Sequence, residues 1–121
     1  MKYKFPHITN IKDVLWAIED CDNIFVGEKD GYNVVNYHML DEHTFPPVEG
    51  LDEGSIDGLK ASIRRECRGM IFCSETGDIL RRPFHKFFNL GERTETLHDN
   101  INMSDSHIIL DKLDGSMIAP F

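Results

Sequence analysis

Two pairs of short β-rich runs, each joined by a tight-turn sequence, constrain the fold of this chain most. In the first pair, residues 24–26 and 32–37 flank a K-D-G sequence, whose Asp-Gly step is typical of hairpins. In the second, residues 68–74 and 79–82 flank E-T-G-D. Strands joined by such short turns pair antiparallel. The chain is therefore predicted to form an antiparallel sheet, not a doubly wound parallel one.

Few helices accompany these runs. Residues 11–20 follow Asn10, a good N-cap, and are predicted to form one amphipathic helix with this apolar face: Ile11, Val14, Leu15 and Ile18. Residues 106–110 are predicted to be a further short strand. The predicted fold class is α+β, a mainly antiparallel sheet with few helices.

The length of 121 residues, 13.9 kDa, suits one compact domain. No apolar run approaches the roughly 20 residues of a membrane-spanning helix, and the first residues lack the apolar stretch of a signal peptide. We therefore expect a soluble, cytoplasmic protein without a membrane partner, in the host cytoplasm if the source is viral.

The cysteines and histidines do not indicate a metal site. The three cysteines, Cys21, Cys67 and Cys73, are an odd number without C-x-x-C spacing. The six histidines show no close ligand spacing. We expect buried free thiols and no zinc.

The distribution of charge along the chain says more about where a polyanion could bind than the net charge of −8 does. Residues 60–93 hold eight Lys/Arg against four Asp/Glu, a net charge of +4, so a polyanion site would lie there. Residues 41–57 carry six acids and no Lys or Arg, beside prolines and glycines. They are predicted to be a solvated loop.

Lys112 is the candidate nucleophile. It follows the predicted strand 106–110 and precedes an Asp-Gly turn, so a rigid element would hold its amine while glycine lets backbone approach a ligand. A lone K-x-D-G sequence is also compatible with a surface lysine beside a turn. The motifs upstream decide between the two interpretations.

Three motifs occur in order: R-G-M-I-F from Arg68, R-P-x-x-K-F-F-N from Arg82 and K-x-D-G-S from Lys112. Taken singly, each has a structural interpretation, since adjacent phenylalanines are usually core and Arg-Gly is usually a turn edge. Together they resemble the N-terminal adenylylation region of phage-type ATP-dependent RNA ligases, the tRNA-repairing kind, in the covalent nucleotidyltransferase superfamily. The resemblance is clearest over residues 64–117.

The resemblance implies a role for each matching residue. Lys112 would attack the α-phosphate of ATP to form lysyl-AMP, and the AMP would pass to an RNA 5′-phosphate before a 3′-hydroxyl displaces it. Arg68 and Lys86 would contact ATP, and Phe88 would pack on adenine. Asp114 and Gly115 complete the nucleophile motif. RNA ends, with tRNA among them, and ATP are the implied partners.

General chemistry agrees with these roles. A lysine amine attacks phosphorus only when neutral, and nearby cations favour the neutral form while they hold the phosphates. We also expect Lys112 to be buried. Aromatic stacking on a base contributes about 1 to 3 kcal/mol. Magnesium is expected because it accompanies ATP phosphates, but the sequence assigns it no ligands.

The family pattern continues with an acidic motif and a lysine pair beyond the nucleophile, and neither occurs before Phe121. We expect residues 1–121 to be the N-terminal part of an adenylyltransferase domain, inactive alone, with an exposed edge that favours self-association. A natural truncated protein is the other interpretation. A DNA ligase, a capping guanylyltransferase and a non-catalytic nucleotide- or RNA-end-binding module remain alternatives.

Overall fold

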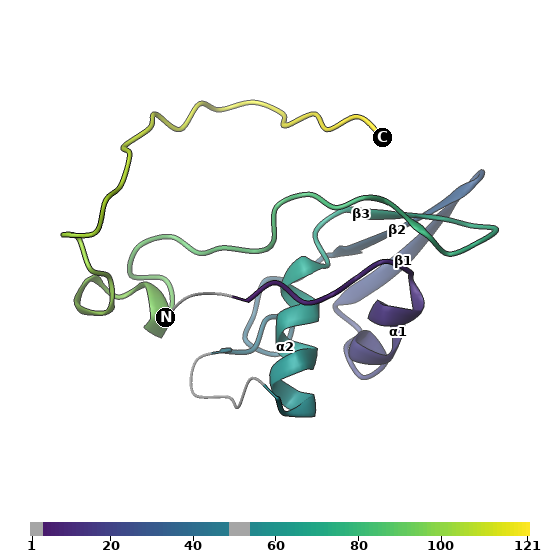
Figure 1. Cartoon of the computed structure of the whole chain (residues 1–121), viewed down its shortest axis with the longest axis horizontal. Coiled ribbons are helices and arrows are strands. Elements are labelled where there is room, and N and C mark those ends of the chain that lie inside the picture. Colours follow the sequence, from purple (N-terminus) through teal and green to yellow (C-terminus); the bar gives the residue numbers. More distant parts are fainter. Residues whose placement is uncertain (1–3, 49–53) are drawn as a thin grey trace. The chain divides into compact units, whose positions relative to one another are not determined.

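The computed structural model describes residues 4–48 and 54–121 (Figure 1). The chain divides into a first unit that ends at Phe87 and a second unit, Phe88–Pro120. Each unit is described by itself.

The described residues of the first unit contain two α-helices and one four-stranded sheet. The elements are α1 (Lys12–Ile18), β1 (Ile24–Lys29), β2 (Tyr32–Tyr37), α2 (Ile56–Glu66), β3 (Met70–Cys73) and β4 (Ile79–Arg81). All neighbouring strands are antiparallel, in the order β1-β2-β3-β4. The predicted α+β class with a mainly antiparallel sheet is confirmed.

Both predicted hairpins occur at the predicted turns. Gly31 closes the β1–β2 turn with φ +83°, and Gly77 lies in the β3–β4 turn with φ +78°. A Cβ atom on Gly77 would lie 2.8 Å from Oδ1 of Asn10. Glycine is therefore required there by both backbone conformation and space.

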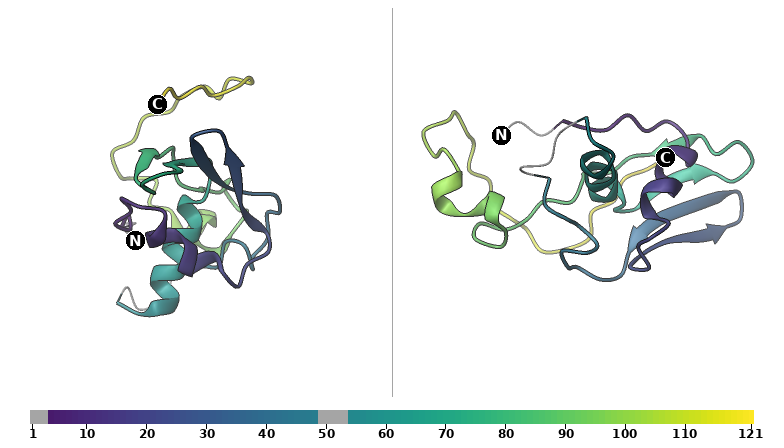
Figure 2. Two further views of the ribbon diagram at one scale, coloured as in Figure 1. Left: turned by 90° about the vertical axis from the view of Figure 1, so that its right-hand side faces the viewer. Right: turned by 90° about the horizontal axis from the view of Figure 1, so that it is seen from below.

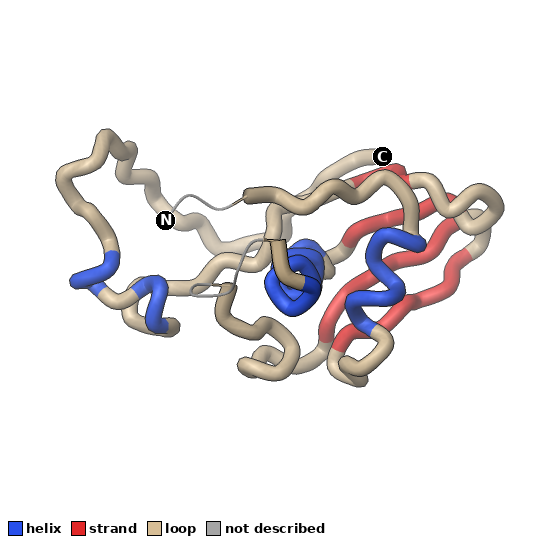
Figure 3. The backbone as a smooth tube through the Cα atoms, turned by 60° about the horizontal axis from the view of Figure 1, so that its bottom comes forward, coloured by secondary structure: helices blue, strands red, loops and turns tan. Residues whose placement is uncertain are grey.

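The core lies between the helices and one face of the sheet (Figures 2 and 3). The fully buried core includes Val14 and Ala17 from α1 and Val35, Met70 and Phe72 from the central strands. The predicted helix at residues 11–20 is confirmed by α1. Its buried face differs in one position, because Leu15 is 42% exposed.

The cysteines agree with the expectation of free thiols. Cys21 and Cys67 are buried and Cys73 is half-buried. Burial raises the pKa of the Cys67 thiol well above its usual range. Its thiol is therefore neutral at physiological pH and packs as a small apolar group.

The start of α1 is fixed by side-chain hydrogen bonds. The carboxylate of Asp13 accepts hydrogen bonds from the backbone amides of Thr9, at 2.9 Å, and Asn10, at 3.0 Å. These two bonds hold the pKa of Asp13 below its ordinary value of 3.8. Asn10 in turn donates to the Thr76 carbonyl at 3.1 Å, which ties this helix end to the β3–β4 turn.

We expect Asp13→Asn to lower the stability of the first unit by at most about 1 kcal/mol near neutral pH, the usual scale of a lost helix cap. Because the pKa of Asp13 is depressed in the folded state, its contribution is present above the unfolded pKa and disappears as the pH falls through the folded pKa. Urea unfolding at pH 6 and at pH 2.5 measures the free energy of unfolding on both sides of the unfolded-state pKa. The variant and parent should differ at pH 6 and differ less at pH 2.5, whereas Asp22→Asn, at an exposed carboxylate, should match the parent at both.

Helix α2 was not predicted, and part of the predicted loop 41–57 is incorrect. The Ser55 hydroxyl accepts a hydrogen bond from the Gly58 amide at 3.0 Å and starts α2 inside that loop. Thr44 and Phe45, expected to be solvated, are fully buried. Residues 49–53 of the predicted loop lie outside the described residues.

The second unit contains two short 3₁₀ turns, η1 (Thr94–Thr96) and η2 (His98–Asn100), and no strand among its described residues. The predicted strand at residues 106–110 is therefore wrong. Its apolar side chains at 108, 109 and 110 are more than 80% exposed. A strand needs a neighbouring backbone for its amides and carbonyls, and no described segment of this unit supplies one.

None of the helices in residues 4–48 and 54–121 has the length and apolar character needed to cross a membrane.

Candidate nucleotide-binding site

Arg68 lies in the short connection between α2 and β3. Its amide donates a hydrogen bond to the Glu66 carbonyl at 2.7 Å, and the next amide, of Gly69, donates to Val35 in β2 at 2.9 Å. Gly69 has φ +85°, a conformation that favours glycine. The Arg-Gly pair of the motif thus forms the turn that starts β3, with Arg68 half-buried beside it.

The guanidinium of Arg68 lies 5.1 Å from the ring centroid of Phe87. This distance permits a cation–π interaction, which restricts the directions available to the guanidinium. Sequence analysis assigned no role to Phe87. Its position beside Lys86 in the K-F-F-N motif was the available signal.

Lys86 lies in the segment that follows β4. Its amide donates to the Arg65 carbonyl at 2.6 Å, so this segment runs beside the C-terminal end of α2. Lys86 is half-exposed. The structure therefore brings the chain segments of the two predicted ATP-contacting cations, Arg68 and Lys86, together within the first unit.

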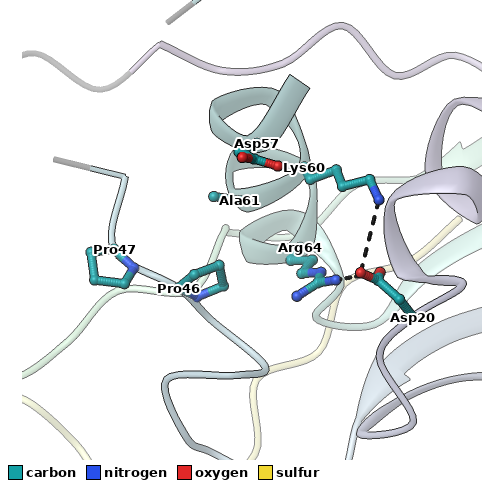
Figure 4. Close-up of a pocket in the computed structure, with 7 residues that line it drawn as sticks. All are labelled: Asp20, Pro46, Pro47, Asp57, Lys60, Ala61 and Arg64. Carbon is teal, nitrogen blue, oxygen red and sulfur yellow. Dashed lines mark hydrogen bonds and ion pairs between the residues drawn. The ribbon is translucent and has the colours of Figure 1, made fainter. Parts of the chain in front are cut away.

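Two other cations of the net-positive window serve the fold. Arg64, only 6% exposed, donates to the Ala17 carbonyl at 2.9 Å, the His43 carbonyl at 3.0 Å and the Asp20 carboxylate at 2.6 Å (Figure 4). Arg82 donates to Glu66 at 3.2 Å. The count of eight positive residues therefore overstates the charge available to a polyanion.

Asp20 also forms an ion pair with Lys60, whose Nζ lies 3.9 Å from Oδ2 of Asp20 (Figure 4). Partial desolvation raises the pKa of Asp20, but Arg64 and Lys60 outweigh it, and the pKa lies below its usual range. These groups line a cleft of about 380 Å³ with Pro46 and Pro47. None of the predicted site residues lines it.

Phe88 is buried in the second unit, and the guanidinium of Arg93 lies 4.6 Å from its ring centroid. Arg93 therefore lies where a flat group stacked on Phe88 would also lie. Sequence analysis counted Arg93 only as part of the net-positive window.

Lys112, Asp114 and Gly115 lie in irregular, exposed chain of the second unit. The expected burial of Lys112 and its place at a strand end are both wrong for this structure. Gly115 has φ +144°, so the turn after Asp114 requires glycine. The motif is thus an exposed turn, flanked by exposed apolar residues such as Leu113 and Ile118.

The six predicted residues divide between the units. Arg68 and Lys86 belong to the first, and Phe88, Lys112, Asp114 and Gly115 belong to the second. Among residues 4–48 and 54–121, no group of three or more His, Cys, Asp or Glu side chains could hold a metal ion.

Residues 66–121 match the family model described as RNA ligase, and this range contains all six predicted residues. The chain is 48% identical over 58 residues to a protein of Thermovibrio ammonificans that carries the name "Putative RNA ligase", and the match covers 48% of this chain and 15% of that protein. It is also 61% identical over 28 residues to RNA ligase 1 of bacteriophage TS2126. That match covers 23% of this chain and 7% of the phage protein. No solved structure matches.

The first unit is a small α+β unit that brings the Arg68 and Lys86 segments together, and the second unit carries the K-x-D-G motif in exposed chain. Over residues 66–121 the chain is similar to RNA ligases, the family that the motifs resemble. The chain spans less than a sixth of the length of these two relatives.

Proposed function

We propose that this chain is the N-terminal part of the adenylyltransferase domain of an ATP-dependent RNA ligase that forms a lysyl-AMP intermediate. The observation that carries the proposal is the order of Arg68-Gly69, the K-F-F-N motif and K-x-D-G-S within the matched range 66–121. In the proposed reaction the partners are ATP and RNA ends, and we place the enzyme in the cytoplasm.

The proposed first step forms a nitrogen–phosphorus bond. The neutral amine of Lys112 attacks the α-phosphorus of ATP, the bond to the β-phosphate oxygen breaks, and pyrophosphate leaves while the amine loses a proton to solvent. Arg68 and Lys86 would hold the phosphates and balance the charge that develops on the leaving group.

The later steps transfer AMP. The 5′-phosphate of an RNA end would attack the phosphoramidate, which releases the Lys112 amine and forms an RNA–adenylate. A 3′-hydroxyl would then displace AMP and form the phosphodiester. Magnesium, bound to the ATP phosphates, would contribute charge neutralisation, but no residue of this chain is assigned to it.

Labelling of the full-length gene product tests this proposal. It is incubated with α-labelled ATP, labelled GTP or adenylate-labelled NAD, with magnesium, and protein-bound label is measured. We expect label from ATP alone. Label from GTP would indicate a capping guanylyltransferase, and label from NAD would indicate an NAD-dependent ligase.

A non-catalytic nucleotide- or RNA-end-binding module is the second candidate. The exposure of Lys112 in irregular chain is the observation that favours it. Such a module would bind ATP or RNA ends and would acquire no covalent label from any of the three nucleotides. The labelling experiment therefore separates the two candidates.

Three substitutions in the proposed site should have different effects. Arg68→Ala and Lys86→Ala should each weaken ATP use by about 10- to 100-fold, because each removes a charge-assisted contact worth about 1.5 to 3 kcal/mol. Loss of either cation should also move the pH dependence of AMP labelling to higher pH. Phe88→Ala should weaken the affinity for adenine and leave that pH dependence unchanged.

The measurement is the initial rate of AMP labelling against ATP concentration and pH. Pro47→Ala, in the cleft that contains no predicted site residue, serves as a control. Identical pH profiles for the three variants and the parent would contradict this division of roles.

A further inference from the structure

An ion pair between a buried carboxylate and a partly exposed guanidinium joins the two chain segments that carry Arg68 and Lys86. Glu66 is 1% exposed, and its Oε2 accepts a hydrogen bond from Nε of Arg82 at 3.2 Å. Nη2 of Arg82 also donates to the carbonyl of Pro6 at 2.8 Å. Neither Glu66 nor Arg82 has a role in the proposed function.

Backbone contacts connect this ion pair directly to the two cations. The Glu66 carbonyl accepts the amide of Arg68 at 2.7 Å, and the carbonyl of the preceding Arg65 accepts the amide of Lys86 at 2.6 Å. A Cβ atom on Gly69 would lie 3.9 Å from Cγ of Pro83, so the two segments also pack closely there. The ion pair and these bonds form one frame that fixes the backbone at Arg68 and Lys86.

We propose that Glu66 and Arg82 are positioning residues that hold Arg68 and Lys86 at the separation required by a nucleoside triphosphate. The inference rests on the proposed function and names the device that prepares its phosphate-binding cations. Neither residue touches the nucleotide. Their effect passes through the backbone between residues 65 and 69 and between residues 82 and 86.

Energetics favours a positioning role over a purely stabilising one. An ion pair with a buried carboxylate is often no more stabilising than apolar residues of the same volume, because the buried charge of Glu66 loses its hydration. Geometry is more sensitive, since a displacement of about 1 Å in a positioning group can cost about 100-fold in rate. The Glu66–Arg82 ion pair is therefore better explained by a role in placing Arg68 and Lys86 than by a role in stabilising the fold.

The test is a double-mutant comparison in the full-length gene product, with the dissociation constant for ATP measured by equilibrium dialysis. Glu66→Gln should raise that constant about tenfold in the parent background. In a background that carries Arg68→Ala and Lys86→Ala, it should change the constant less than twofold, because the groups being positioned are absent. A merely structural role would weaken binding similarly in both backgrounds.

Two further variants complete the test. Asp20→Asn breaks the Arg64–Asp20 ion pair, which joins α1 to α2, and should leave the ATP dissociation constant within twofold of the parent value. If Glu66→Gln does not fold, the paired change Glu66→Met with Arg82→Met replaces the ion pair by apolar side chains and should also raise the constant about tenfold.

The outcomes separate this inference from the proposed function. An unchanged dissociation constant in the parent background, or an equal rise in both backgrounds, would overturn the positioning role while AMP labelling of the parent remains intact. Absence of both ATP binding and AMP labelling in the parent would overturn the proposed function and this inference together.

Discussion

Lys112→Ala is expected to abolish AMP labelling of the full-length gene product, with a loss of about 10⁴-fold or more. No other group in the K-x-D-G-S motif can form the phosphoramidate. Because Lys112 is exposed and lies in irregular chain, its truncation should not change the thermal midpoint of unfolding. Intact-mass spectrometry after incubation with ATP and magnesium measures the covalent adduct.

Lys112→Arg distinguishes a nucleophile from a simple cation. Its guanidinium stays protonated at working pH and cannot attack phosphorus, so this variant should also form no adduct. Lys29→Ala, at an exposed lysine at the end of β1, is the matched control and should be labelled like the parent. A persistent AMP adduct in Lys112→Ala would refute the assignment.

The parts of the fold that sequence analysis predicted are those with local signals. The turns at Gly31 and Gly77 require glycine because of their positive φ, and β-rich runs flank both. Asn10 precedes α1 and its side chain accepts the Lys12 amide at 3.1 Å, so the cap was visible in the sequence. Turn and cap chemistry act within a few residues and need no knowledge of the tertiary structure.

Helix α2 was missed because its buried residues mix apolar side chains, such as Ala61 and Ile63, with charged ones. The last three residues of α2, Arg64, Arg65 and Glu66, are all buried, whereas Ile56 and Leu59 are exposed. A periodicity of apolar residues therefore does not mark the packed side. The signal that could have indicated α2 was Ser55, a good N-cap, followed by Asp57 in the first turn.

The predicted strand at residues 106–110 was wrong for a different reason. Its apolar composition is real, but a strand forms only where another strand satisfies its backbone, and that is a property of the tertiary structure. The same limit applies to Lys112, whose expected burial depended on this strand. Local patterns predicted the motif and could not predict its surroundings.

The candidate site shows the same division. The motifs indicated Arg68 and Lys86, and the structure brings their segments together. Charge counting could not separate them from Arg64, because the sequence does not show that Ala17, His43 and Asp20 converge on that guanidinium. The structure therefore assigns neighbouring arginines to different tasks.

Because Arg64 is bonded within the fold, Arg64→Ala should destabilise the first unit by about 3 kcal/mol or more. The change removes charge-assisted hydrogen bonds to two backbone carbonyls, at about 1.5 kcal/mol or more each, and leaves space beside the fully buried Ala17. At about 4 °C or more per kcal/mol for a unit of this size, the thermal midpoint should fall by about 12 °C or more.

Scanning calorimetry of the 121-residue chain measures this effect, and two variants calibrate it. Lys60→Ala removes the partly exposed partner of Asp20 and should cost less than about 1 kcal/mol, as surface ion pairs do. Arg64→Lys keeps the charge, but its single ammonium group lacks the forked geometry with which arginine reaches all three acceptors. Its midpoint should therefore lie between those of the parent and Arg64→Ala. Arg68 lies only four residues from Arg64 but has a different proposed role. Arg68→Ala should therefore leave the midpoint nearly unchanged. A midpoint for Arg64→Ala equal to that of the parent would refute the structural role of this arginine.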